Sequence, residues 1–254
     1  MTASPRALAT ASVSFLAFLG AVAIGLASMP VYALSGRKRD ADVAGKGGQL
    51  LGGMGDFVLH WFMWAITPLV QMSRSLGLTP DFYNYAGLVL GVASGPLIAF
   101  GKLELGGWAI ILCGIADILD GRLARLGGTA SNYGDFIDST FDRFVEASTF
   151  LGFACYLRAV PQGPLLAAAA LAGSLLVSYA RARGEVLGVN CTGGLMQRAE
   201  RLFLTALVCL LDPTLTARFG WPAGTIALWA LGLLAVTTFF TAIYRTFWIA
   251  ARLK

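Results

Sequence analysis

The sequence is poor in charged side chains: 13% of its 254 residues are Asp, Glu, Lys or Arg, against about 25% in an ordinary soluble domain. This shortage argues against a soluble globular enzyme, and the apolar composition excludes a disordered chain. Histidine occurs once, at His60, so a multi-histidine metal site is excluded. The four cysteines lack the spacing of metal ligands, and the chain does not read as a disulfide-stapled secreted domain.

Hydrophobic residues, in contrast, make up 57% of the chain, and the mean hydropathy is +0.70. Apolar runs of about twenty residues recur along it, each long enough to cross a hydrocarbon core of about 30 Å. The strands of an outer-membrane barrel would instead alternate apolar and polar residues. We therefore predict an all-α polytopic membrane protein with a six-transmembrane-helix core, one extra N-terminal transmembrane helix and an interfacial helix.

The apolar runs divide the chain into three predicted parts. Residues 1–55 hold a transmembrane helix at 9–34 and a glycine-rich linker; the basic residues at 37–39 favour a transmembrane helix over a signal peptide. Residues 56–77 form an amphipathic interfacial helix, because aromatic residues there mix with His60, Gln71 and Arg74. Residues 78–254 form the six-helix catalytic domain, with runs at 82–100, 105–126, 136–157, 165–179, 194–211 and 223–250.

The positive charges orient these spans. Threading seven crossings places all but four of the 19 Lys and Arg residues on one side, the exceptions being Arg6, Lys102, Arg158 and Arg218. Because cytoplasmic loops are enriched in Lys and Arg, that side is the cytoplasm. We expect an integral protein of the cytoplasmic (inner) membrane. The net charge of +5 then reflects these loops and anionic lipid, and no nucleic-acid partner is expected.

Acidic residues gather in one short stretch, 117–142, at the predicted cytoplasmic ends of two helices. Asp117 and Asp120 share one helix face at i and i+3, and Asp138 and Asp142 share a face of the next helix at i and i+4. Ionisable groups at membrane depth usually mark a functional site. Four converging carboxylates repel one another unless cations separate them, and carboxylate oxygens suit Mg²⁺ or Mn²⁺ rather than zinc. The spacing predicts two divalent cations that clamp a diphosphate.

Small residues are interleaved with these acids. Gly121, Ala124 and Gly134 leave room for a flat base and its diphosphate to approach the backbone, although small residues also allow tight helix packing in membranes. The whole stretch resembles the CDP-alcohol phosphotransferase signature, D-x-x-D-G-x-x-A-R-x8-G-x3-D-x3-D, at every fixed position. Upstream, 78–81 resembles the family's L-T-P-N entry into its first core helix, with Asp81 in place of the Asn.

The resemblance implies a reaction and a set of roles. Enzymes of this family transfer the phosphatidyl group of CDP-diacylglycerol to an alcohol and release CMP. By resemblance, the metal ligands are Asp117, Asp120, Asp138 and Asp142, and Asp142 is also the general base on the acceptor hydroxyl. The resemblance assigns nucleotide binding to Asp120, Gly121, Ala124, Arg125 and Gly134. The chemistry is coherent, because the metals neutralise the diphosphate while the base deprotonates the alcohol.

A second, basic region at 178–201 bears on the acceptor. It resembles the branch of the family that makes phosphatidylinositol phosphate: Arg181 and Arg201 match positions that grip the acceptor phosphate there, while Gln197 replaces a Glu. We expect Arg245, near the end of the last helix, to complete this acceptor-phosphate pocket. Forked guanidinium groups suit a phosphate, so a phosphorylated acceptor such as inositol phosphate is expected.

Alternatives remain open at this point. The arginines could instead be membrane anchors, and the acceptor could be glycerol 3-phosphate, as in a phosphatidylglycerophosphate synthase, or an unphosphorylated alcohol such as inositol, serine or choline. From other classes, a prenyltransferase would favour DDxxD-like clusters on separate helix pairs, and a transporter would not require the Gly and Ala positions. A homodimer is common in the family, and the small residues of the helices permit one.

Overall fold

The computed structural model describes residues 5–35 and 53–254, and every regular element in those ranges is an α-helix. The predicted linker falls almost wholly outside the described residues. The helices are α1 (Pro5–Leu34), α2 (Gly53–Ser75), α3 (Pro80–Ala99), α4 (Leu103–Gly127), α5 (Asn132–Tyr156), α6 (Gly163–Val186), α7 (Arg198–Phe219) and α8 (Thr225–Ala250). The all-α prediction is confirmed.

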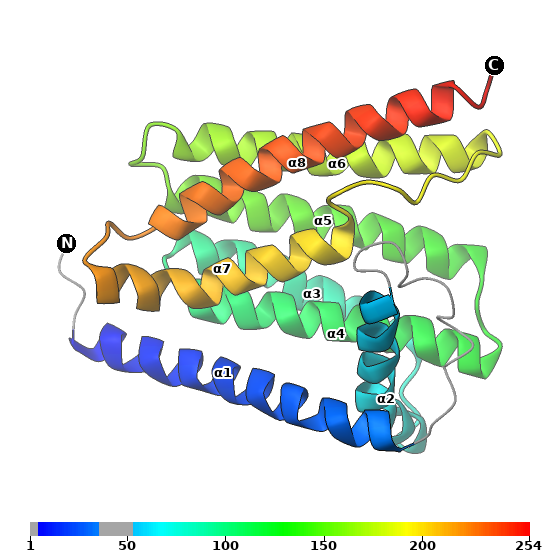
Figure 1. Cartoon of the computed structure of the whole chain (residues 1–254), viewed down its shortest axis with the longest axis horizontal. Helices are drawn as coiled ribbons and strands as arrows, with labels where there is room; N and C mark the ends of the chain where they lie inside the picture. The colour runs from blue at the N-terminus through cyan, green and yellow to red at the C-terminus, as the bar shows by residue number, and fades with distance from the viewer. Residues whose placement is uncertain (1–4, 36–52) are drawn as a thin grey trace.

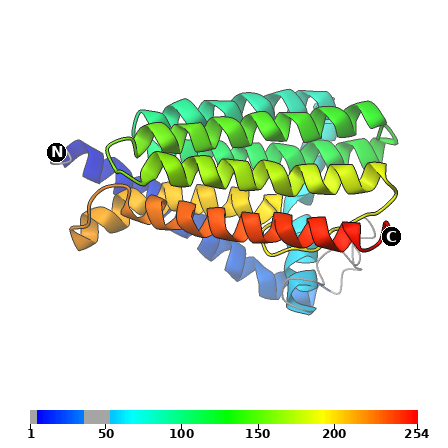
Figure 2. The same cartoon turned by 90° about the horizontal axis from the view of Figure 1, so that it is seen from above.

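Helices α3 to α8 run alongside one another as a bundle, with α1 on its outside and α2 crossing the common direction (Figures 1 and 2). α3 packs against α4 and α5, α4 against α7, α5 against α6, and α6 against α8. One apolar core joins these helices, centred on side chains such as Phe150, Phe153 and Leu231. The bundle therefore holds α4 and α5, which carry the acidic stretch, between other helices.

Five helices are long and apolar enough to cross a membrane: α1, α3, α6, α7 and α8. The other two predicted spans, α4 and α5, have 25 residues each, or about 37 Å at 1.5 Å per residue. They are long enough to cross but less apolar, because they carry the acidic stretch. The four acids of the predicted site are nevertheless buried or half-buried within the bundle.

Helix α2 is amphipathic, as predicted for an interfacial helix. One face buries Met63, Ile66 and Val70, while Leu69 and Met72 remain exposed. Arg122 of α4 fixes this face, because its Nη1 donates to the carbonyl oxygen of Met63 at 2.6 Å. The helix that lies across the bundle is thus attached directly to the helix of the acidic stretch.

The extra N-terminal helix α1 packs against α7 and α2. Two indole N–H groups hold it: Trp108 of α4 donates to Ser14 Oγ and Trp61 of α2 to Ser28 Oγ, each at 2.8 Å. On its other side α1 exposes large apolar side chains, among them Ile24. An apolar exposed face combined with polar contacts on the inner face is the pattern of a helix between lipid and protein.

Two predicted boundaries are wrong. α6 continues to Val186, about two turns past the predicted end at 179, and α7 runs from Arg198 through Pro213 to Phe219, past the predicted end at 211. The turn comes at Gly220, in the left-handed conformation with φ +67°. Asp212 instead caps the next helix: its carboxyl oxygens accept the N–H groups of 224, 226 and 227 at 2.9, 2.8 and 3.1 Å.

Glycines let α3 approach α5 closely, at a point further along α5 than the acidic stretch. A Cβ on Gly95 would lie 2.2 Å from Ser148 Oγ, and one on Gly152 would lie 2.4 Å from the Gly95 carbonyl oxygen. Ser148 Oγ uses this proximity to donate to the Val92 carbonyl at 2.7 Å. The close contact brings the start of α3 beside the acids of α5.

Candidate metal and substrate site

Three carboxylates converge where α4 ends and α5 begins. Asp117 and Asp120 come from α4 and Asp138 from α5, and each offers one oxygen within 4.8 Å of the other two. Asp120 is buried and the other two are half-buried. A compact all-carboxylate group sheltered from bulk water fits a hard divalent cation. The fold thus brings together residues that the helical spacing predicts to be neighbours.

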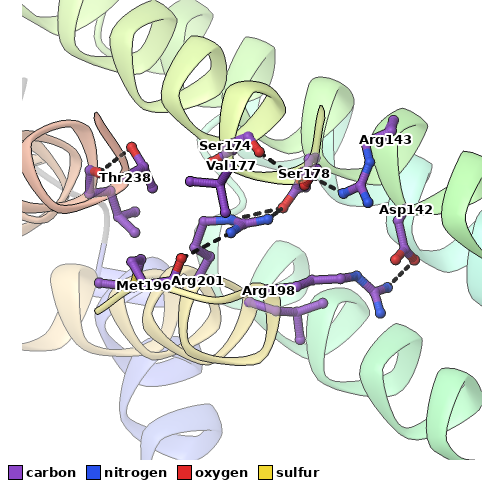
Figure 3. Close-up of polar contacts among 12 residues, drawn as sticks. Asp142, Arg143, Ser174, Val177, Ser178, Met196, Arg198, Arg201 and Thr238 are labelled. Carbon is purple, nitrogen blue, oxygen red and sulfur yellow. Dashed lines mark hydrogen bonds and ion pairs between the residues drawn. The ribbon is translucent and has the colours of Figure 1, made fainter. Parts of the chain in front are cut away.

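The fourth acid, Asp142, lies one turn further along α5, is buried and lines the same cavity. Its partner is Arg198, whose Nη2 forms an ion pair with Asp142 Oδ1 (Figure 3). Nη1 of the same guanidinium donates to Asp117 Oδ1 at 2.8 Å. Arg198 is therefore a site residue that the sequence left open between a membrane anchor and a phosphate ligand, and that was not among the predicted site residues. Its place three residues before Arg201, in the same basic stretch, is the signal that could have found it.

The cavity of the four acids has its other walls on α3, α4 and α5. Tyr83 and Asn84 of α3, Cys113 of α4 and Phe141 of α5 line it. Asp81, which stands in the family's Asn position, is exposed instead. Asn84, one turn later on the same helix, is thus the amide side chain that α3 presents to the acids.

The predicted nucleotide residues lie around the α4–α5 turn. The Arg125 guanidinium folds back over Gly121, where an added Cβ would be 3.1 Å from Nη1. Ala124 is half-buried beside them. Gly134 lies in the first turn of α5, and its N–H donates to the N-cap hydroxyl of Ser131 at 3.2 Å. The three small residues therefore lie in the last turns of α4 and the first turn of α5, on either side of the connecting turn.

A second cavity lies on the other side of Asp142. It contains a buried cation, Arg201, whose Nε and Nη2 both donate to Glu146 Oε1, the Nε bond being 2.9 Å. Arg201 Nη1 also donates to the Met196 carbonyl at 3.3 Å, and Arg143 Nη1 contacts Glu146 Oε2 at 3.2 Å (Figure 3). Glu146, on the next turn of α5 after Asp142, thus holds Arg201 in place.

The other two predicted acceptor residues have protein partners of their own. Arg245 is buried and donates to the carbonyl oxygens of Gly193 and Val177 at 2.9 and 3.1 Å. Arg181 is exposed and pairs with Glu185 at 2.8 Å. Arg245 lies close enough to Arg181 and to Arg201 for its positive charge to be repelled by each of them. The structure thus gathers three cations at this end of the bundle without a direct contact between them.

Comparison with known proteins agrees with this geometry. The family model described as CDP-alcohol phosphatidyltransferase matches residues 78–251. A phosphatidylinositol phosphate synthase of Streptomyces avermitilis is 33% identical over 73% of this chain and 78% of its own length. An archaetidylinositol phosphate synthase of Methanothermobacter thermautotrophicus is 32% identical over 70% of this chain and 87% of its own length.

Solved structures of phosphatidylinositol phosphate synthase from Mycobacterium tuberculosis have the same fold. The structure with CDP-DAG bound has 28% sequence identity and a TM-score of 0.61 over 72% of this chain and 92% of that one. The complex with manganese and citrate gives a TM-score of 0.63 over 72% of this chain and 88% of that one. The family match covers well over half of the sequence, including the whole acidic stretch. The chain is a membrane enzyme that belongs to the CDP-alcohol phosphatidyltransferase family.

Proposed function

We propose that this enzyme transfers the phosphatidyl group of CDP-diacylglycerol to inositol phosphate and releases CMP. The observation that carries the proposal is the position of a buried arginine, Arg201, in a cavity that shares Asp142 with the cavity of the four carboxylates. One of these, Asp142, lies between the two cavities, so a donor diphosphate at the acids and an acceptor phosphate at Arg201 would meet at it. The relatives named as phosphatidylinositol phosphate synthases support the same acceptor.

The acid cluster is proposed to hold two divalent cations, Mg²⁺ or Mn²⁺, on Asp117, Asp120, Asp138 and Asp142. An all-carboxylate set of this compactness fits them, and the related synthase that was solved with manganese supports the choice. When bound, the cations neutralise the diphosphate and stabilise CMP as a leaving group.

The chain's own residues complete the reaction. Asp142 takes the proton from the acceptor hydroxyl, a role that suits a carboxylate at the boundary of the two cavities. The nucleotide can approach the backbone at the small residues Gly121, Ala124 and Gly134. The Arg125 guanidinium, which lies over Gly121, is placed to pair with the negative charge of the nucleotide's phosphates. Because the acids are sheltered from bulk water, the acceptor is favoured over water as the attacking group.

The acceptor phosphate is proposed to bind Arg201, with Arg181 and Arg245 adding positive charge around it. A fixed fork of N–H donors recognises phosphate geometry better than a point charge does. Arg201 is held by Glu146 and the Met196 carbonyl, so its position is set before the acceptor arrives. A positioned guanidinium loses less entropy on binding than a mobile one.

The membrane arrangement is part of the proposal. The basic excess at the ends that carry the acids supports a site facing the cytoplasm, in the cytoplasmic (inner) membrane. Residues 78–254 are the catalytic domain, 56–77 the interfacial helix, and 1–55 the extra helix and its linker. The small residues on the helices support a homodimer as the assembly.

Purified enzyme in lipid nanodiscs tests the reaction. With radiolabelled CDP-diacylglycerol and Mg²⁺ or Mn²⁺, CMP release should require inositol phosphate rather than glycerol 3-phosphate or free inositol. Asp138→Asn should abolish turnover, whereas Asp135→Asn, an exposed acid one turn earlier on the same helix, should leave it near wild type. Full activity of Asp138→Asn would refute the metal centre. Equal use of free inositol would refute the phosphate pocket alone.

A further inference from the structure

Arg198 makes the contacts that a cation in the acid cluster would make. Its guanidinium donates to Asp117 Oδ1 at 2.8 Å and forms an ion pair with Asp142 Oδ1, so one cation joins an acid of α4 to an acid of α5. About a quarter of its side chain is exposed, and Asp142 is 9% exposed. Because these side chains are largely buried, the positive charge of Arg198 compensates the negative charges of Asp117 and Asp142 in place of solvent.

The backbone around Arg198 is fixed. It is the first residue of α7, so the positive end of the helix dipole adds to its charge. The segment before it is tied to α8, because the Met196 N–H donates to Thr241 Oγ1 at 3.2 Å and Arg245 Nε holds the Gly193 carbonyl at 2.9 Å. The helix start is therefore anchored, and what can change is the direction of the side chain.

Arg198 also borders two cavities. It lines the cavity of the four acids and, together with Asp142, the second cavity that contains Glu146 and Arg201. A long side chain anchored at this boundary reaches Asp142 on one side, as Figure 3 shows, and borders the cavity lined by Arg201 on the other. Its side chain has several staggered torsions, so its charge can take more than one position at this boundary.

We propose that Arg198 is the counter-cation of the metal-free acid cluster, which divalent cations must displace. The carboxylate oxygens that it occupies are those a metal needs, so the guanidinium and the metal compete for Asp117 and Asp142. Metal binding then displaces the guanidinium from Asp117 and Asp142 toward the second cavity. The inference rests on the proposed metal centre and adds a positioning residue that acts through its exchange with the metal.

The test is Mn²⁺ binding to purified enzyme without substrates, followed by electron paramagnetic resonance. Arg198→Gln removes the competing charge and should bind Mn²⁺ about tenfold to a hundredfold more tightly than wild type, the range expected for one to two lost contacts with charged groups. Arg198→Lys keeps a positive charge that reaches fewer carboxylate oxygens, so its Mn²⁺ affinity should lie between those of wild type and Arg198→Gln. Arg183→Gln, an exposed arginine at the end of α6, removes the same charge away from the acids and should stay within about twofold.

Two readouts of opposite sign separate this role from a structural one. Arg198→Gln should bind the metal more tightly yet turn over more slowly, and its thermal stability should fall without metal and recover when Mn²⁺ is added. Mn²⁺ affinity equal to or weaker than wild type in a folded Arg198→Gln protein would overturn the proposal while leaving the metal centre intact. Failure of wild type and all three variants to bind Mn²⁺ would instead overturn the metal centre itself.

Discussion

The buried pair of Glu146 and Arg201 predicts a large and specific loss of stability. The perturbation is Glu146→Gln, which removes the charge and keeps the shape of the side chain. Arg201 is 2% exposed and Glu146 11%, so water cannot replace the lost carboxylate. Two N–H groups of Arg201 point at the same Glu146 oxygen. The variant therefore leaves a buried guanidinium without its counter-ion.

The expected magnitude follows from that burial. Breaking a buried ion pair by removing one partner costs about 3–5 kcal/mol. The Gln carbonyl oxygen can still accept both hydrogen bonds, because both go to one oxygen, so we expect the lower end of this range, about 3 kcal/mol. Arg201→Gln leaves Glu146 with its contact to Arg143, which is a third exposed, and should cost less. Because the two single changes remove the same interaction, the double variant should lose about 2 kcal/mol less than their sum.

Unfolding of the four proteins in mixed micelles, followed by tryptophan fluorescence, measures this double-mutant cycle. The pair of Arg181 and Glu185 is the matched control: it has the same chemistry at 2.8 Å, but its side chains are 47% and 42% exposed. Its coupling should be below about 1 kcal/mol. Additive losses for Glu146 and Arg201, or equal coupling in both pairs, would refute the argument from burial.

Three further outcomes are expected. Asp212→Asn should lower thermal stability by about 1–3 kcal/mol, because an amide cannot accept all three backbone N–H bonds, while the folded fraction keeps its specific activity. Gly95→Ala should destabilise by about 1–3 kcal/mol or more, since its Cβ meets the Ser148 backbone at 2.3 Å, whereas Gly232→Ala, with open space, should be neutral in the same melt. Chelation with EDTA should stop CMP release and Mn²⁺ should restore it; CMP release that persists in metal-free enzyme would contradict the carboxylate centre.

The arrangement of the acids was predictable because it depends on local geometry. Residues at i and i+3 or i+4 share a helix face whatever the rest of the fold does, and a glycine-rich turn between two helices forces a hairpin. The convergence of Asp117 and Asp120 with Asp138 therefore follows from spacing alone. The same holds for the seven long apolar or nearly apolar helices, since their lengths are set by the bilayer.

The partners of the arginines were not predictable in this way. Arg198 pairs with acids 81 and 56 residues earlier in the chain, and no local rule links such positions. The end of α7 was wrong for a related reason: Asp212-Pro213 reads as a helix break, but the carboxyl group is occupied by the N–H groups of 224–227 and the helix continues past the proline. Long-range partners decide the use of a polar side chain, and spacing within one helix does not reveal them.

The capping of α8 by Asp212 also bears on how the protein enters the membrane. A side chain of α7 accepts hydrogen bonds from the N–H groups at the start of α8. Until the two helices pack together, the Asp212 carboxyl group and these N–H groups therefore lack their partners. In hydrocarbon, an uncapped helix end or a solitary carboxyl group is costly, which favours release of both segments from the insertion machinery as one hairpin. The last two crossings of the chain are then a single unit of biogenesis, and a truncation that stops after α7 should leave that helix poorly inserted.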